Sequence, residues 1–173
     1  MNFCKRFFGH LRTITKHRRE VRKLCFKCGL YWQGLTHDLS KFSPVEFWNG
    51  VKYYTGTASP HLGERKVYGY SKAWLNHKGR NKHHAEYWHD IGGAVEMPPQ
   101  YFVEMICDRI AACKIYLGSK YVDDAPWEYY VTHKDENQFH PYTRDLLEFV
   151  LCNLATKGEE YAIQMLRDSM EKT

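Results

Sequence analysis

The pair His37-Asp38, followed by Lys41, is the part of this chain best suited to chemistry. An aspartate has two carboxylate oxygens, so one side chain beside an imidazole can serve two metal ions at once. Two-metal sites of this kind activate water and clamp phosphoryl oxygens. Lys41 follows about one helical turn later, from where its ammonium group can reach a phosphate at the same metal. A surface lysine before a helix cap is the alternative interpretation of Lys41.

A second group of candidates is the run from His77 to Glu86, which includes His83 and His84. Three imidazoles and one carboxylate favour Mn, Fe, Co, Ni or Zn over Mg or Ca. His77 and His84 share one face if a helix continues through Gly79, and His83 then points elsewhere or donates a hydrogen bond to a ligand. An exposed histidine-rich loop is the alternative.

Two further candidates lie in helical, apolar surroundings. His17 is on the apolar side of a long amphipathic helix, where a hydrogen-bonded core histidine is the alternative role. Asp108 lies in a helix that is apolar almost all round, and an unpaired carboxylate there is costly. At 100° per residue, Arg109 and Lys114 point away from it, so a metal ion is the better partner. The candidate metal ligands are therefore His17, His37, Asp38, His77, His83, His84 and Asp108.

Charged residues near these ligands supply the other expected roles. Cationic side chains are suited to binding a substrate phosphate, and carboxylates to proton transfer. We predict one or two divalent transition-metal ions as cofactors and a small phosphorylated substrate, such as a nucleotide. The candidate catalytic residues are Asp38, Lys41 and Glu86, and the candidate substrate contacts are Lys41, Arg80, Lys82 and Arg109.

The composition fits one domain over residues 1–173, with a net charge of +5. No apolar run approaches the roughly 18–20 residues that a membrane span needs, so we expect no membrane partner. No signal-peptide core is present in residues 1–28. Six cysteines are too few for a disulfide framework, and the pair Cys25-x2-Cys28 is a weak zinc signal. These features favour a reduced, cytoplasmic protein.

Hydrophobic periodicity predicts an all-α bundle of about six to seven helices that must position these ligands. Ser43-Pro44-Val45-Glu46 is a capping box that starts one of them. We expect a short helix to hold His37 and Asp38, a loop over 55–69, a short helix near 126–130 and no strand. The longer predicted helices are 2–31, 44–52, 71–76, 99–117, 141–157 and 159–171.

The start of the chain is strongly basic, with nine Lys or Arg in residues 5–27 against the single acid Glu20. Such a face can attract nucleotides or nucleic acid, or it can be a solvated helix surface. Nucleic acid is therefore a candidate partner for this helix.

Several short segments resemble known families. The ligand order H…HD…H…HH…D resembles the HD-domain superfamily of metal-dependent phosphohydrolases, and the strings HDLSK and HHAE resemble motifs of its cyclic-dinucleotide phosphodiesterase branch. Nothing matches the GYP tripeptide of that branch. The strings HDLSKFSP, NKHHAEYW and EMICDR are similar to an HD-like bacterial and phage family of unknown function. The resemblance covers about residues 10–118, which would form the metal-site core.

The resemblance implies one metal ion held by His17, His37, Asp38 and Asp108. It implies a second ion that is bridged by Asp38 and held by His77 and either His83 or His84. The implied activity is hydrolysis of a nucleotide or other small phosphoester. Two other functions compete with it: an HD-type di-iron oxygenase, and a non-catalytic module that binds nucleic acid or a protein partner through the basic first helix.

Overall fold

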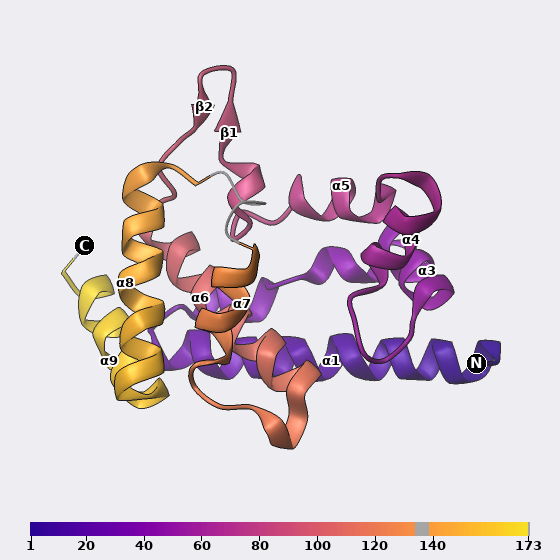
Figure 1. The fold of residues 1–173 in the computed structure, drawn as a ribbon, viewed down its shortest axis with the longest axis horizontal. Coiled ribbons are helices and arrows are strands. Elements are labelled where there is room, and N and C mark those ends of the chain that lie inside the picture. The colour runs from indigo at the N-terminus through magenta and orange to yellow at the C-terminus, as the bar shows by residue number, and fades with distance from the viewer. Residues whose placement is uncertain (134–138, 173) are drawn as a thin grey trace.

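Helices make up most of the computed structural model, which describes residues 1–133 and 139–172 (Figure 1). The all-α prediction is confirmed, although the described residues form nine α-helices rather than six or seven. Three short 3₁₀ segments, η1 (Leu39–Phe42), η2 (Ala85–Tyr87) and η3 (Gly118–Lys120), connect them. The helices are α1 (Phe3–Lys27), α2 (Tyr31–Thr36), α3 (Pro44–Tyr53), α4 (Pro60–Tyr68), α5 (Lys72–Lys78), α6 (Pro99–Leu117), α7 (Ala125–His133), α8 (Pro141–Lys157) and α9 (Glu159–Met170).

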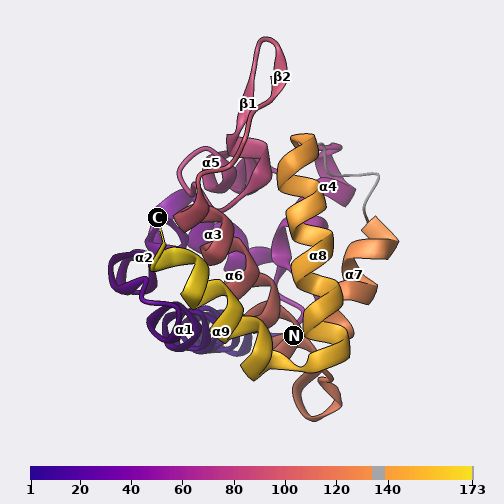
Figure 2. The same ribbon diagram turned by 90° about the vertical axis from the view of Figure 1, so that its left-hand side faces the viewer.

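The long helix α1 runs along the base of the molecule and supports two groups of helices (Figure 1). Helices α3, α4 and α5 pack on one another, and α3 contacts α1. The second group contains α6, α7, α8 and α9, and both α6 and α9 contact α1 (Figure 2). His17 lies near the middle of α1, which places it between the two groups.

The hydrophobic core lies between the C-terminal half of α1 and the second group. Val21 on α1, Ile106 on α6, Leu147 on α8 and Ala162 on α9 are all completely buried in one cluster. Burial of such side chains is worth about 1.5–3 kcal/mol each. The candidate ligands on α1 and α6 are therefore carried by helices that the core holds in place.

The segment 55–69 is not the loop that the sequence predicted, because it contains α4. Pro60 occupies the start of α4, and Gly69 ends it with a positive φ of 79°, the usual arrangement of these two residues at helix ends. A Cβ at Gly63 would lie 3.0 Å from the Cβ of Tyr53, so glycine permits the close approach of α4 to α3. The cluster of glycines and prolines was the reason for the wrong prediction.

Other predicted boundaries also differ from the structure. Helix α1 ends at Lys27, since the chain turns at Gly29, which has a φ of 79°. A small antiparallel hairpin, β1 (His89–Asp90) and β2 (Gly93–Ala94), corrects the prediction that no strand is present, and it projects from the helices (Figure 1). The short helix predicted near 126–130 is the first part of α7, which continues to His133. No helix among the described residues has the length and apolar character needed to span a bilayer.

Candidate metal centre

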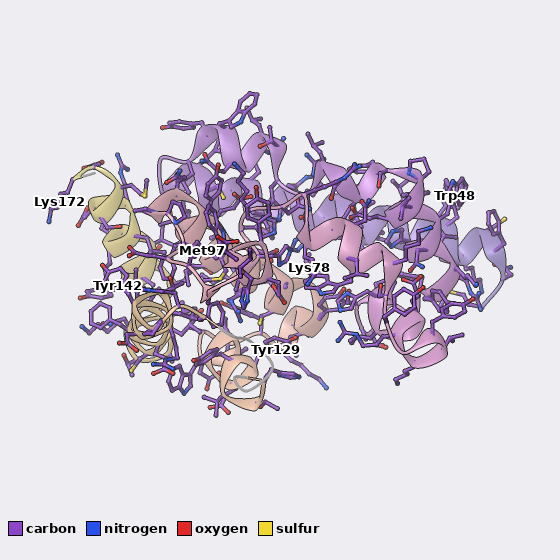
Figure 3. The ribbon with its side chains drawn as sticks, turned by 90° about the horizontal axis from the view of Figure 1, so that it is seen from above. Trp48, Lys78, Met97, Tyr129, Tyr142 and Lys172 are labelled. Carbon is purple, nitrogen blue, oxygen red and sulfur yellow. The ribbon has the colours of Figure 1, made fainter. Side chains whose placement is uncertain are left out.

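The candidate ligands come from five segments that meet between the two groups of helices. His17 comes from α1, Asp108 from α6 and His77 from α5. The turn after α2 supplies His37 and Asp38, and the segment between α5 and η2 supplies His83 and His84. In the view from above, Lys78, the last residue of α5, lies between Trp48 on one side and Tyr142 on the other (Figure 3). Most of the candidate ligands are buried, so the site lies inside the fold and not on its surface.

One group of side chains consists of His17, His37, Asp38 and Asp108. His17 Nε2 lies 2.9 Å from Asp108 Oδ1 and 3.6 Å from Asp38 Oδ2. His37 Nε2 lies 3.3 Å from Asp38 Oδ2, 3.5 Å from Asp108 Oδ1 and 3.4 Å from His17 Nε2. Four potential ligand atoms, two nitrogens and two oxygens, therefore face one point.

The second group consists of Asp38, His77, His83 and His84. His77 Nε2 lies 3.3 Å, and His83 Nε2 lies 3.5 Å, from Asp38 Oδ1. The ring centroids of His77 and His84 are 4.8 Å apart. Asp38 thus directs Oδ2 toward the first pair of histidines and Oδ1 toward the second, which is the arrangement of a bridging carboxylate.

The chemistry of the two groups fits a transition metal. Ligands 2.0–2.2 Å from a tetrahedral or octahedral ion lie about 2.8–3.6 Å from one another, and the distances within the first group fall between 2.9 and 3.6 Å. Asp38 Oδ1 and the Nε2 atoms of His83 and His84 are buried without a hydrogen-bond partner among the described residues. Buried polar atoms are rarely left in this state, and a bound cation would satisfy all three.

Two carboxylates outside these groups orient the imidazoles. Glu104 Oε1 lies 2.8 Å from His37 Nδ1 and 3.2 Å from His83 Nδ1, so one oxygen accepts from both rings. Glu46 Oε2 lies 2.8 Å from His77 Nδ1. When Nδ1–H of a neutral imidazole donates to a carboxylate, Nε2 has its lone pair free to bind a metal. Burial by itself would lower the pKa of His37, but Asp38, Asp108 and Glu104 outweigh it and raise that pKa well above its usual range, so a metal ion would displace a proton from this ring. All three rings present Nε2 to Asp38.

The turn that carries His37 and Asp38 is not the short helix that the sequence predicted. Helix α2 ends at Thr36, and Asp38 has φ 54° and ψ 27°, the one positive φ of a non-glycine among the described residues. Aspartate tolerates this left-handed conformation better than most residues. Arg18 Nε donates to the carbonyl of His37 at 2.7 Å, and Arg18 Nη2 donates to that of Leu35 at 3.1 Å. Arg18 therefore holds the turn and is not part of the free basic face.

Mutual charge stabilisation sets the protonation states in the site. Burial by itself would raise the pKa of the Asp38 carboxyl, but the charges of His37 and Lys41 outweigh it and hold that pKa well below its usual range. Burial alone would also raise the pKa of the Asp108 carboxyl. Hydrogen bonds from His17 and His37 outweigh burial and hold that pKa well below its usual range. Both carboxylates are therefore ionised at neutral pH, as metal ligands must be.

His84 has a pKa well below the usual histidine value, because it is buried and close to His83 and His77. Its ring is thus neutral at pH 7, the form in which imidazole binds a metal. Helix α5 stops at Lys78 and does not continue through Gly79, so a turn and not a shared helical face brings His77 and His84 together. His83 also faces Asp38, at 3.5 Å against 3.3 Å for His77.

Two of the four predicted substrate contacts, Lys41 and Arg109, lie close to the candidate ligands. Lys41 Nζ lies 2.5 Å from Asp38 Oδ2, and 30% of the Lys41 side chain is exposed. Arg109 is close enough to Asp108 and Glu86 for their charges to act on it, and its guanidinium lies over the ring of Phe139.

Two other predicted substrate contacts and one predicted catalytic residue lie apart from the two groups. Lys82 Nζ lies 5.4 Å from the centroid of the Tyr101 ring, and Arg80 is exposed. Arg80 donates its backbone N–H to the carbonyl of His77 at 3.1 Å, but among the described residues no recorded side-chain hydrogen bond or ion pair joins Arg80, Lys82 or Glu86 to the candidate ligands. Their substrate-binding and catalytic roles stay predictions.

Glu46 is the residue of this site that the sequence did not indicate. It was interpreted as part of a capping box, but Ser43 makes no side-chain cap bond, and Glu46 accepts from His77 and Ser40 instead. A glutamate in the first turn of a helix looks the same in the sequence whether it caps the helix or orients a histidine. Glu104 lies one turn before Asp108 on α6, and that spacing is what allows both to face the site.

Comparison with known proteins places the chain in a family without assigning an activity. No curated protein and no solved structure matches it. The model of one protein family, described as a family of unknown function (DUF5662), matches residues 6–153, a span that includes every candidate ligand. Because that match covers most of its length, the chain belongs to the family of unknown function DUF5662.

Proposed function

We propose that this protein is a metal-dependent phosphohydrolase of the HD type that acts on a nucleotide or another small phosphoester. The observation that carries the proposal is the position of Asp38, whose two oxygens face separate histidine pairs. The resemblance of the H…HD…H…HH…D order to HD-domain phosphohydrolases points in the same direction. A site built only for structure would not require two groups joined by one shared carboxylate.

The residues that would hold the metal ions are the two groups described above, with Asp38 common to both. Bound there, one or two transition-metal ions would act as Lewis acids and lower the pKa of coordinated water. Glu104 and Glu46 keep three imidazoles in the tautomer that leaves Nε2 free. The core on α1 and α6 keeps His17 and Asp108 in place before a ligand arrives.

Lys41 supplies the positive charge for a phosphoryl group. It carries a full charge at neutral pH, because burial alone would lower its pKa but the charges of Asp38 and Asp108 outweigh burial and raise it. Its partly exposed side chain lies at the edge of an otherwise buried site. There the ammonium group can leave its ion pair with Asp38 and bind a phosphoryl oxygen instead. A fixed cation beside developing negative charge stabilises the transition state. Arg109 is the second candidate for this role, on the other side of Asp108.

The test is metal content together with hydrolysis of two general probes, p-nitrophenyl phosphate and bis(p-nitrophenyl) phosphate. We expect one to two equivalents of transition metal by mass spectrometry and metal-stimulated release of nitrophenol. Asp38→Asn keeps the size of the side chain and tolerates the left-handed backbone, so it should fold while losing metal and activity. Asp145→Ala, at an exposed position, is the matched control.

The result that contradicts the proposal is an Asp38→Asn variant with the metal content and hydrolysis of the unmodified protein. The element found also separates two enzyme classes. Iron with visible absorbance and oxygen sensitivity, without hydrolysis of either probe, would replace the hydrolase by the oxygenase.

A further inference from the structure

The outer side of α1 carries a regular row of cations. At 100° per residue, seven positions of α1 fall within an arc of about 80°. Six of these seven residues are Lys or Arg, the seventh is Gly9, and all six cationic residues are exposed. They extend over about 33 Å at 1.5 Å per residue. We call these residues the basic row: Lys5, Arg12, Lys16, Arg19, Lys23 and Lys27.

The basic row lacks the acids that a solvated helix surface usually contains. Glu20 is the single acid of α1, and it pairs with Lys23 at 3.1 Å. No other ion pair with a member of the row is recorded in the described part of the chain. Helix α9 is different, because it mixes both signs and pairs Arg167 with Glu171. Like charges three or four residues apart destabilise a helix, so the row has a structural disadvantage that an anionic partner would remove.

The apolar stripe of α1 on the side opposite the row is already occupied. Ile14, Val21 and Leu24 on the inner side are buried in the protein, and His17 belongs to the candidate metal centre. In Figure 2, which looks nearly along α1, neighbouring helices lie above it and to its right, and no described element lies below it. A helix that binds a bilayer surface buries its apolar face in the lipid. The buried stripe of α1 is not free, and the exposed phenylalanines of this helix, Phe3, Phe8 and Phe26, do not form a continuous apolar face. Both observations argue against a membrane as partner.

We propose that the basic row binds the phosphate backbone of duplex nucleic acid without reading its sequence. A straight line of positive charge about 33 Å long corresponds to one turn of a duplex, about 34–36 Å. Lys and Arg along one line contact phosphates and release their counterions. The row lies about 120° around the helix from His17, so the bound duplex lies beside the metal centre rather than in it. Binding thus holds the protein on nucleic acid and does not depend on metal.

The experiment is fluorescence anisotropy of a labelled DNA duplex of about two turns, titrated with the full chain in EDTA at several salt concentrations. The logarithm of the affinity should fall with the logarithm of salt concentration with a slope of about −5, from about −0.9 per phosphate contact and six cations. In the triple variant Arg12→Gln, Lys16→Gln, Arg19→Gln, the slope should weaken by about 2.7. The affinity at low salt should fall by at least about 30-fold.

A charge-matched control separates the row from general attraction to a positive protein. The variant Lys66→Gln, Lys72→Gln, Lys120→Gln removes the same charge from exposed positions outside α1. It should keep the affinity within about threefold of that of the unmodified protein. Equal losses in the two triple variants, or an affinity that does not change with salt, would overturn the proposal. Tighter binding to a single strand, or to phosphatidylserine vesicles, would replace the duplex as partner.

Folding of the variants is checked by circular dichroism. We expect the triple variant of the row to melt at the same or a higher temperature, because repulsion between neighbouring cations is relieved. The three single variants, each with a slope weaker by about 0.9, provide the same test in less altered proteins. Since all binding is measured without metal, failure of the hydrolase proposal does not affect the result.

Discussion

Glu104 offers the sharpest test of how the candidate centre is built. One of its oxygens accepts hydrogen bonds from His37 in the first group and from His83 in the second. The substitution Glu104→Gln keeps the size of the side chain, and its amide oxygen can still accept from both rings. What it removes is the negative charge that strengthens the two bonds and makes the imidazoles better metal ligands. The variant should therefore weaken both metal sites at once.

The expected magnitude follows from measured effects of such outer carboxylates. Loss of a hydrogen-bonded partner of a metal-binding imidazole typically costs 10–100-fold in metal affinity, which is about 1.4–2.7 kcal/mol. Because a glutamine at this position would keep the hydrogen bonds, we expect the affinity for each metal ion to fall by about tenfold, the lower end of this range. Glu104→Ala leaves two buried donors without a partner, at about 1–3 kcal/mol of folding stability, so we prefer the glutamine variant.

The assay is titration of the metal-free protein with Co²⁺, followed by visible absorbance and calorimetry. Glu46→Gln is the matched control, since Glu46 contacts His77 alone among the candidate ligands. We expect two weakened binding steps in Glu104→Gln and one in Glu46→Gln. Unchanged affinities in Glu104→Gln would refute the role of Glu104, and identical behaviour of the two variants would refute the shared bridge. Absence of Co²⁺ binding by the unmodified protein would instead refute the metal centre.

Three further predictions concern the scaffold around the site. Arg18→Gln removes two hydrogen bonds to the turn at His37. Amide hydrogen exchange in that turn should therefore accelerate, and Co²⁺ should bind more weakly. The control Arg19→Gln, at an exposed position, should change neither the exchange rate nor the Co²⁺ affinity. Burial and the charge of Lys41 lower the pKa of His10 to about 4; stability from the neutral ring is complete above pH 6.5 and falls with pH toward 4. Urea unfolding should therefore show a loss of about 2 kcal/mol between pH 7 and 5 that is absent in His10→Gln. A Cβ at Gly50 would lie 2.1 Å from His10 Nε2, so Gly50→Ala should lower the unfolding free energy by about 1–3 kcal/mol, and an unchanged value would show that the ring moves aside at little cost.

Local sequence was sufficient to predict the long helices, because each of them shows one hydrophobic period over many residues. Helical spacing identified α1, α6, α8 and α9 and the inward direction of His17, which is 7% exposed. These helices are long, and their apolar stripes agree with the core that buries them. The cost of burying a lone carboxylate identified Asp108 as a residue that needs a partner. The structure places it 2.9 Å from His17.

Tertiary structure decided whatever depends on residues far apart in the chain. Glu46 meets His77 across 31 residues, and Glu104 meets His37 across 67. No local pattern distinguishes such a carboxylate from a helix cap. The left-handed backbone of Asp38 exists because Arg18 and the neighbouring ligands hold the turn, and helix periodicity cannot indicate that conformation. The amino-acid types and their order indicate which residues could form a metal centre. That these residues meet follows from the packing of α6 on α1 and of α5 on α3, because convergence needs contacts that no single helix contains.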